Sequence, residues 1–555
     1  MKKRICFISA FLFLLINVAF NQTVIPAGEV FGNWLKSASP YLIEGEINVP
    51  LNQTLEIEAG VTVKFNGHFK FNIYGCLLAN GTLADSIRFS TDDHETGWHG
   101  IRFIDTESNT QPASSLSYCI IEYGKSFGTC PDNSGGGIYI GHSNPIIRFN
   151  TIRNNTAFSG ISDWGGGGIY SEYSNPEIRD NLITQNYSGH DGGGIYCGYG
   201  SPIISDNRII DNEAASRGAG IACFNFSAPD ILRNAISDNS ANQIGGGIYL
   251  SGNSSLVQSN IIQNNYASDG GGIACFLSNP NIYNNLIREN EAVKGAGIWN
   301  QGSSPYIFNN TIINNMAIDY GGGMYNIAGM AGVVVYSNPL TANNIIYLND
   351  AEEGKQLYSN TDNVPTLWYN DIEGLTGDGI YGEVNEEEGN FDYDPLFDTL
   401  GEHDCALMEN SMCIDNGVNT VSNANIPLPE MDILGNKRIW DGDSDGMAAA
   451  DMGAYEFGSS PLGFDDIRPT FATDIIISPN PFKTSSAIKY ELKQNKKVIL
   501  TIYNQTGKQV YQTEENQSQG NQQLIWNADD FVDGIYYFRL QIADEIAIGK
   551  MVKVR

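Results

Sequence analysis

The stretch GGGIYCGYGSPIISDNRIIDNEA, residues 192–214, decides the fold of this chain. Its pattern returns along the sequence, with a glycine-rich run before an isoleucine at positions 169, 195, 221, 248, 273 and 298, a spacing of 25 to 27 residues. A period this short indicates a repeat architecture. Each copy holds three short β-type segments separated by glycine, Ser-Pro and Asn-Asn, which predicts three strands per repeat.

A column of isoleucines and a column of asparagines complete the repeats. Neighbouring copies share the offsets of Pro202, Ile204, Asn207, Ile209 and Asn212. The pattern resembles the right-handed parallel β-helix, the pectate-lyase-like solenoid whose coils stack about 4.8 Å apart. The resemblance implies stacked interior isoleucines and a ladder of asparagine side chains bonded from coil to coil. The ladder is expected at Asn181, Asn207, Asn234, Asn260, Asn285 and Asn310.

Composition limits the class of protein. The chain has 555 residues, 61 glycines and a formal charge of -32 at pH 7. Abundant glycine with moderate charge suits a turn-rich all-β protein rather than a disordered one. Such an acidic chain lacks the basic surface that nucleic-acid binding needs, so we expect no nucleic-acid partner.

The two ends of the chain differ from the repeats. Lys2, Lys3 and Arg4 precede an apolar run that ends at Phe20, which predicts a signal peptide over residues 1–21. No second apolar segment of spanning length follows, so no transmembrane span is expected in the mature protein. From residue 471 onward there are ten basic and nine acidic residues, so the net acidity of the chain lies upstream.

The tail has its own pattern. Alternating strands with Asn-Gly-type turns predict a small antiparallel β-sandwich. The phrases SPNPF (478–482), VILTIY (498–503), GKQV (507–510) and KMVKVR (550–555) resemble a type A sorting domain of the type IX secretion system. The resemblance implies the type IX secretion machinery as a partner. It also implies delivery through the periplasm to the outer cell surface or beyond.

These observations predict a sequence of segments after the signal peptide. A parallel β-helix is expected over residues 22–350, with atypical N-terminal capping coils at 39–104 and regular coils at 134–350. Residues 351–458 are expected to form an irregular C-terminal cap, 459–472 a linker and 473–555 the sorting domain. The fold class is all-β, a right-handed parallel β-helix solenoid followed by a small C-terminal antiparallel β-sandwich.

Eight cysteines remain after removal of the signal peptide, in a chain exported through an oxidising compartment. Two pairs are disulfide candidates, Cys119 with Cys130 and Cys405 with Cys413, and the sequence leaves the connectivity open. Three others take inward positions after the repeat isoleucine, where cysteine acts as a small hydrophobe rather than as a metal ligand. They are Cys197, Cys223 and Cys275.

The segment DGDSDG, residues 441–446, is a candidate calcium loop. Asp441, Asp443 and Asp445 stand at alternate positions before a glycine, and Ca²⁺ takes six to eight oxygen ligands. Asp451 lies one residue before the last ligand position of the EF-hand pattern and is the candidate that completes the set. A solvated acidic turn is the alternative interpretation.

Two columns of side chains are candidates for function. Charged residues stand four positions before the repeat isoleucine, and they are candidates for acid and base chemistry: Asp191, Arg217, Asp269 and Lys294. Such charges also neutralise a turn without catalysis. An aromatic column follows the isoleucine, on the outer face of the sheet by strand alternation: Tyr139, Tyr170, Tyr196, Tyr249, Trp299 and Tyr325. Exposed rings suit sugar faces, and cross-strand packing is the other interpretation.

The sequence therefore favours a secreted or cell-surface β-helix protein that binds polysaccharide or another surface ligand. The alternative is a polysaccharide lyase or glycoside hydrolase, which the fold supports only by analogy. The sequence contains no nucleophile elbow, phosphate loop or zinc spacing. Calcium is the one cofactor expected.

Overall fold

The computed structural model divides the chain into two folding units, residues 1–433 with 439–457 and residues 434–438 with 458–555. The structure describes residues 22–106, 112–158, 165–252, 254–330, 332–398, 403, 405–421, 426–460, 476–480, 482–492, 494–504, 509–528, 531–532, 534–542 and 545–554. The predicted signal peptide and most of the predicted linker lie outside these residues.

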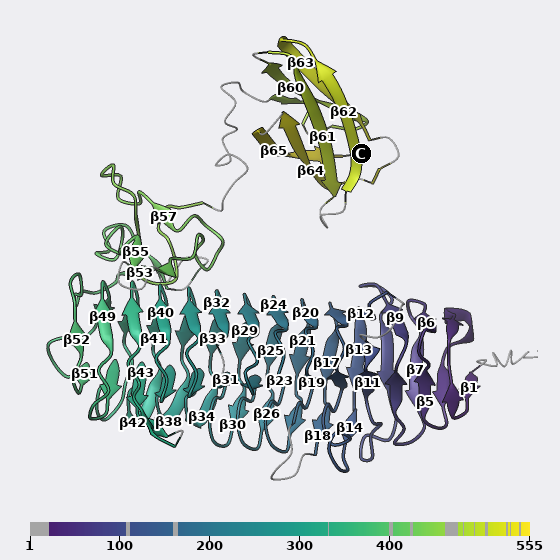
Figure 1. Cartoon of the computed structure of the whole chain (residues 1–555), viewed down its shortest axis with the longest axis horizontal. Coiled ribbons are helices and arrows are strands. Elements are labelled where there is room, and N and C mark those ends of the chain that lie inside the picture. Colours follow the sequence, from purple (N-terminus) through teal and green to yellow (C-terminus); the bar gives the residue numbers. More distant parts are fainter. Residues whose placement is uncertain are drawn as a thin grey trace, which may run out of the picture. The chain divides into compact units, whose positions relative to one another are not determined.

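Three long parallel sheets, which we name A, B and C, form the solenoid. Sheet A runs from β1 (Thr23–Ile25) to β50 (Asp371–Ile372), sheet B from β2 (Gly28–Glu29) to β51 (Ile380–Tyr381), and sheet C from β3 (Gly32–Trp34) to β52 (Asn385–Glu386). Each has 14 strands, and strands of successive coils lie side by side along the solenoid (Figure 1). The predicted fold class and the three strands per coil are confirmed.

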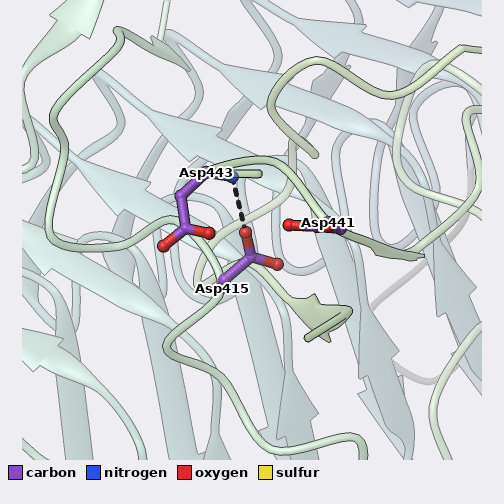
Figure 2. A group of neighbouring side chains, drawn as sticks. All are labelled: Asp415, Asp441 and Asp443. Atoms are coloured by element: carbon purple, nitrogen blue, oxygen red, sulfur yellow. Dashed lines mark hydrogen bonds between the residues drawn. The ribbon is translucent and has the colours of Figure 1, made fainter. Parts of the chain in front are cut away.

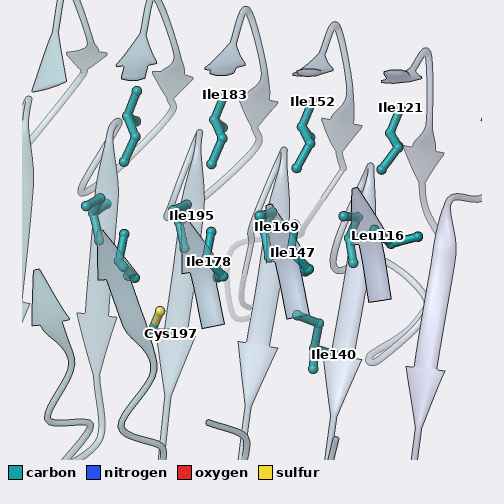
Figure 3. Packing of buried hydrophobic residues seen from close by; sticks show 14 of the residues in the cluster. Leu116, Ile121, Ile140, Ile147, Ile152, Ile169, Ile178, Ile183, Ile195 and Cys197 are labelled. Carbon is teal, nitrogen blue, oxygen red and sulfur yellow. The ribbon is translucent and has the colours of Figure 1, made fainter. Parts of the chain in front are cut away.

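Isoleucine side chains fill the interior. In one coil, β23 (Ile195–Gly198), β24 (Ile203–Ser205) and β25 (Arg208–Ile210) bury Ile195, Ile204 and Ile209 completely. The register places Ile209 between Ile183 and Ile236 of the adjoining coils. Figure 3 shows such columns in the preceding coils, with Ile121, Ile152 and Ile183 in one row and Ile147 and Ile178 in another. Because only the next coil closes the apolar face of each coil, stability is shared between neighbours.

Two asparagine ladders line the turns on either side of sheet A. The backbone N–H and the Nδ2 of Asn207 both donate to Asn234 Oδ1, at 2.9 and 3.0 Å, and Nδ2 also donates to the carbonyl of Ile178 at 2.8 Å. The predicted ladder is confirmed at all its positions. The second ladder repeats this geometry, with Asn212 Nδ2 donating to Asn239 Oδ1 at 3.0 Å.

A fourth parallel sheet, D, stands between sheets A and B. It has eight strands, from β14 (Lys125–Ser126) to β42 (Met316–Tyr320), and includes β26 (Glu213–Ala214). Before each strand of sheet B the chain turns at a glycine. Gly192 has a φ of +68°, and a Cβ on it would lie 2.8 Å from the Cβ of Tyr196. The turn therefore lies directly against the outer face of sheet B.

The end of the solenoid differs from the prediction. Coils continue past residue 350, because β50, β51 and β52 still pair with sheets A, B and C. The irregular segment that follows first pairs with the last coil, since Phe391 bridges Asp371 and the N–H of Asn370 donates to Asn390 Oδ1. Asn284, Asn309 and Asn343, on three successive coils, donate from Nδ2 to the carbonyls of Met431, Asp451 and Val418. The later part of this segment, which includes Val418, Met431 and Asp451, lies alongside the last coils, and we name it the lateral cover.

The tail is a sandwich of two antiparallel sheets. One sheet orders β59 (Ile476–Ser478), β60 (Ser485–Leu492) and β63 (Gly520–Asn527), and the other orders β62 (Gln509–Gln517), β61 (Lys496–Asn504), β64 (Gly534–Ile542) and β65 (Glu545–Lys553). One core, with Ile488, Leu500, Trp526 and Phe538, lies between them. The predicted small antiparallel sandwich is confirmed.

Candidate functional site

The aromatic column lies on the outer face of sheet B but is buried. The expectation of an exposed strip is wrong, because the relative exposure is at most 5% at Tyr170, Tyr196, Tyr249, Trp299 and Tyr325. The rings stack on one another, with the centroids of Tyr170 and Tyr196 4.8 Å apart. They form an apolar cluster separate from the interior core. The glycine turns cover this cluster, so its ring faces are closed to a sugar.

The charged column lies in the same layer of turns that covers the buried rings. Arg217 donates to both carboxylate oxygens of the fully buried Asp191, at 2.9 and 2.8 Å. Its guanidinium lies 4.7 Å from the ring centroid of Phe224, within the aromatic cluster. Asp269 and Lys294 pair at the same place in later coils, where burial raises the pKa of Asp269 and Lys294 opposes that rise. The charges thus neutralise one another over the rings.

Both predicted disulfides are wrong, because Cys119 and Cys413 keep their thiols, which lie against other groups. Cys119 is buried inside the solenoid, with its thiol 3.3 Å from the carbonyl oxygen of Ala79, whereas Cys130 is exposed. The thiol of Cys413 donates to Asp371 Oδ2 at 3.2 Å instead of pairing with Cys405. The prediction of buried, apolar cysteines is confirmed for Cys197, Cys223 and Cys275.

Three carboxylates meet in the lateral cover. Asp415, Asp441 and Asp443 each offer an oxygen within 4.8 Å of the others (Figure 2). Asp415 was not predicted, because it stands 26 residues before Asp441 and outside any local spacing pattern. Its Oδ2 accepts hydrogen bonds from the N–H groups of Gly442 and Asp443, at 2.7 and 2.8 Å. Asp441 Oδ1 is buried and has no hydrogen-bond partner, so this oxygen is available as a metal ligand.

The other two predicted calcium ligands lie outside this cluster. Asp445 accepts from the N–H of Met447 at 2.7 Å. Both oxygens of Asp451 are used by the backbone, since they accept from the N–H groups of Asp415 and Phe457 at 2.8 and 2.6 Å. The candidate set is therefore corrected to Asp415, Asp441 and Asp443. Water and backbone oxygens would have to complete the six to eight ligands that Ca²⁺ takes.

Exposed rings do occur, at the turn between sheets B and C. Tyr74, His142, Tyr173, Tyr199 and Phe226 form what we name the corner strip. They follow the ends of β8 (Phe71–Ile73), β15 (Ile138–Gly141), β19 (Ile169–Glu172), β23 and β27 (Ile221–Phe224). Tyr173 is 46% exposed, Tyr199 42% and Phe226 86%. The ring of Tyr173 stacks between those of His142 and Tyr199, with centroids 5.0 and 4.6 Å away.

The backbone of the corner strip is held in the left-handed region. The φ angles are +47° at His142, +49° at Tyr173 and +51° at Tyr199. Later coils place Gly252 and Gly302 at this turn, with φ of +62° and +59°, so the turn itself imposes the conformation. A residue with a Cβ costs roughly 1–2 kcal/mol there. Positive φ recurs at other turns of the solenoid, among them Phe149, Asp206 and Leu277, so this conformation marks the turns of the coils rather than a site.

A repeated offset in the sequence marks the strip. His142, Tyr173 and Tyr199 each stand four residues after a repeat isoleucine. At the N-terminal end of the strip lies a hollow of about 300 Å³. Its lining comes from three successive coils: Asn48, Pro50, Leu51, Tyr74, Ile104 and Asp105.

Two family models match the chain. Residues 59–278 match a right handed beta helix region, and residues 477–554 match a secretion system C-terminal sorting domain. The chain is therefore a parallel β-helix protein whose tail directs it through type IX secretion to the cell surface or the exterior. Among the described residues, no helix is long and apolar enough to cross a membrane.

Two solved structures match the chain at low similarity. The A-module of the mannuronan C-5 epimerase AlgE6 from Azotobacter vinelandii is 14% identical, with a TM-score of 0.34 over 66% of this chain and 91% of that one. The enzymatically active domain of tailspike protein 2 from bacteriophage CBA120 is 9% identical, with a TM-score of 0.23 over 95% of this chain and 72% of that one. Scores this low add nothing about function. No curated protein matches the chain.

Proposed function

We propose that this secreted β-helix protein binds polysaccharide at the cell surface, and that the corner strip is the contact surface. The observation that carries the proposal is the run of exposed, stacked rings at His142, Tyr173 and Tyr199. Two later coils have a glycine at the same turn, Gly252 and Gly302. Asn225 and Leu277 hold the same left-handed conformation at this turn without a ring, so the proposal rests on the exposure and stacking of the rings and not on their backbone conformation.

Stacked rings suit a long, flexible ligand. Tyr173 lies between two rings that cover its two faces, and the residue is still 46% exposed. Tyrosine offers contact area and hydrogen bonding with few rotatable bonds, so little side-chain entropy is lost on binding. Phe226, at 86% exposure, adds an accessible apolar ring in the next coil. A glycan that lies along the coils would meet these groups in succession.

The alternative, a polysaccharide lyase or glycoside hydrolase, receives no support from the charged column. Asp191 and Arg217 neutralise one another over buried rings. An acid or base would have to reach the proton that it transfers in a bound substrate. The proposal is therefore one of binding.

The test compares two corners of the same solenoid. Replacing Tyr173 and Tyr199 together by alanine should weaken binding to a polysaccharide array about tenfold or more, on the order of 1.4 kcal/mol. Phe149→Ala is the matched control, since Phe149 is 38% exposed, has a φ of +56° and stacks on Tyr118 at the turn between sheets C and A. Equal effects of both changes, or the absence of any glycan that binds, would contradict the proposal.

We also propose that Asp415, Asp441 and Asp443 hold a calcium ion. The buried, unpartnered Oδ1 of Asp441 supports it, because a buried carboxylate oxygen without a partner is costly. The ion would tie the loop at 441–446 to Asp415 and so stabilise the lateral cover. This role is structural and independent of the corner strip.

A further inference from the structure

We infer that the hollow at the N-terminal end of the corner strip is a subsite for an uncharged sugar unit of the bound polysaccharide. The inference rests on the proposed function and adds the chemical class of the ligand. Its lining combines an apolar surface with two polar side chains and, among the described residues, contains no basic one, and the guanidinium of Arg102, which interacts with Tyr74, is already engaged. Each of these features favours a neutral sugar over an acidic one.

Neighbouring strands of sheet B build the hollow. Asn48 lies on β5 (Ile47–Val49) and Ile104 ends β11 (Ile101–Ile104), with β8 between them in the sheet. Leu51, Tyr74 and Asp105 come from the turns after these strands. A volume of about 300 Å³ is at the lower end for small-molecule sites, which suits one or two sugar rings.

The hollow is continuous with the stacked rings. Ile104 pairs with Gly141, Gly141 with Glu172, and Glu172 with Gly198, so the residues that follow them occupy equivalent places in successive coils. Those residues are Asp105, His142, Tyr173 and Tyr199, all with positive φ. A glycan that follows His142 and Tyr173 toward the N-terminus therefore arrives at Asp105 and the hollow.

The lining matches the two faces of a sugar. Pro50, Leu51 and Ile104, with the ring of the 38% exposed Tyr74, supply apolar surface for the C–H groups. The amide of Asn48 both donates and accepts hydrogen bonds, whereas the carboxylate of Asp105 only accepts. Sugar hydroxyls are donors to that carboxylate. The carboxylate of a uronate, or a sulfate group, would be repelled by it.

The guanidinium of Arg102, which interacts with Tyr74 of the lining, is committed elsewhere. Arg102 is only 2% exposed and donates to the carbonyls of Pro131 and Ser134 at 2.9 and 3.2 Å. The long-range field acts in the same direction, since the net charge of -32 lies almost wholly upstream of the tail.

The experiment is calorimetric titration of the full secreted chain with two oligosaccharides of equal length, cellohexaose as the neutral probe and hexagalacturonate as the acidic one, with a neutral β-1,3-glucan hexamer and a mannan hexamer as further neutral probes. We expect at least one neutral hexamer to bind at least tenfold more tightly than the acidic one. Tyr74→Ala should weaken that binding tenfold, and Asp105→Asn about threefold. Leu83→Ala, at an 88% exposed side chain outside the hollow, should change nothing.

The outcomes separate the two proposals. Tighter binding of hexagalacturonate than of every neutral hexamer would overturn the assignment of an uncharged sugar. Neutral binding that depends on Tyr173 and Tyr199 but not on Tyr74 would overturn the hollow as a subsite and leave the proposed function standing. If no oligosaccharide and no polysaccharide binds, the proposed function itself fails. Thermal melting of each variant confirms that it is folded.

Discussion

Replacing Asn234 by alanine should destabilise the solenoid by roughly 3–5 kcal/mol, because this side chain serves three coils at once. Its Oδ1 accepts from the N–H and the Nδ2 of Asn207 at 2.9 and 3.0 Å. Its Nδ2 donates to the carbonyl of Ile204 at 2.8 Å and to Asn260 Oδ1 at 3.0 Å. Alanine removes these four bonds, each worth about 1 kcal/mol net, which gives a loss of about 4 kcal/mol.

Urea titration followed by circular dichroism measures this loss, and hydrogen exchange of peptides around residue 207 locates it. Asn242→Ala is the matched control, since Asn242 is exposed and carries no ladder bond. We expect the control to change the free energy of unfolding by less than about 0.5 kcal/mol. If Asn234→Ala and Asn242→Ala behave alike, the ladder does not hold the coils together as argued.

Three further predictions concern the turns, the lateral cover and its metal. Gly192→Ala should lower the free energy of unfolding, measured by urea titration, by about 3 kcal/mol, and Gly252→Ala by about 1 kcal/mol. Both glycines have positive φ, but only a Cβ at residue 192 would lie 2.8 Å from Tyr196. Equal losses would refute the close cover over the aromatic column. Burial raises the pKa of Asp371 to about 7, and Asp392 and Asp394 add to the rise while the N–H of Tyr393 and the thiol of Cys413 oppose it. Since an unfolded aspartate has a pKa of about 4, the folded state keeps a proton that the unfolded state loses, so the free energy of unfolding should fall by up to about 4 kcal/mol between pH 4 and 7 and then level off. Asp371→Asn should remove that component of the pH dependence, and unchanged pH profiles of the urea midpoint would contradict it. Calcium at a hundredfold excess over its Kd should add about 2.7 kcal/mol to the wild type and nothing to Asp441→Asn; melting curves of the wild type that coincide in calcium and in chelator would exclude the site.

Periodicity was sufficient to predict the solenoid, its interior isoleucines and the asparagine ladder, because every coil repeats the same contacts. It was not sufficient for Tyr196. Strand alternation correctly assigns that side chain to the outer face of sheet B, but alternation says nothing about a second layer over the face. The information was in Gly192, whose positive φ returns the chain over the ring.

Contacts between distant segments escaped the sequence analysis for a related reason. Asp415 joins Asp441 only because the lateral cover folds back on itself, and no local spacing encodes that approach. Cys119 and Cys130 are near in sequence, yet one side chain faces the inside of a coil and the other lies on an exposed turn. Short separation along the chain was therefore a poor guide to pairing.

The asparagine ladders also have a direction. Asn181 donates to Asn207, and Asn207 donates to Asn234, so within the ladder each asparagine Oδ1 accepts from the preceding asparagine and each Nδ2 donates to the following one. Any coil can therefore follow any other without a change at the junction. Gain or loss of one repeat of 25 to 27 residues would leave both ladders intact, and the length of the solenoid is free to vary in evolution in whole coils. Each added coil would add one turn to the row of turns between sheets B and C, and would so lengthen the surface that is available to the proposed ligand.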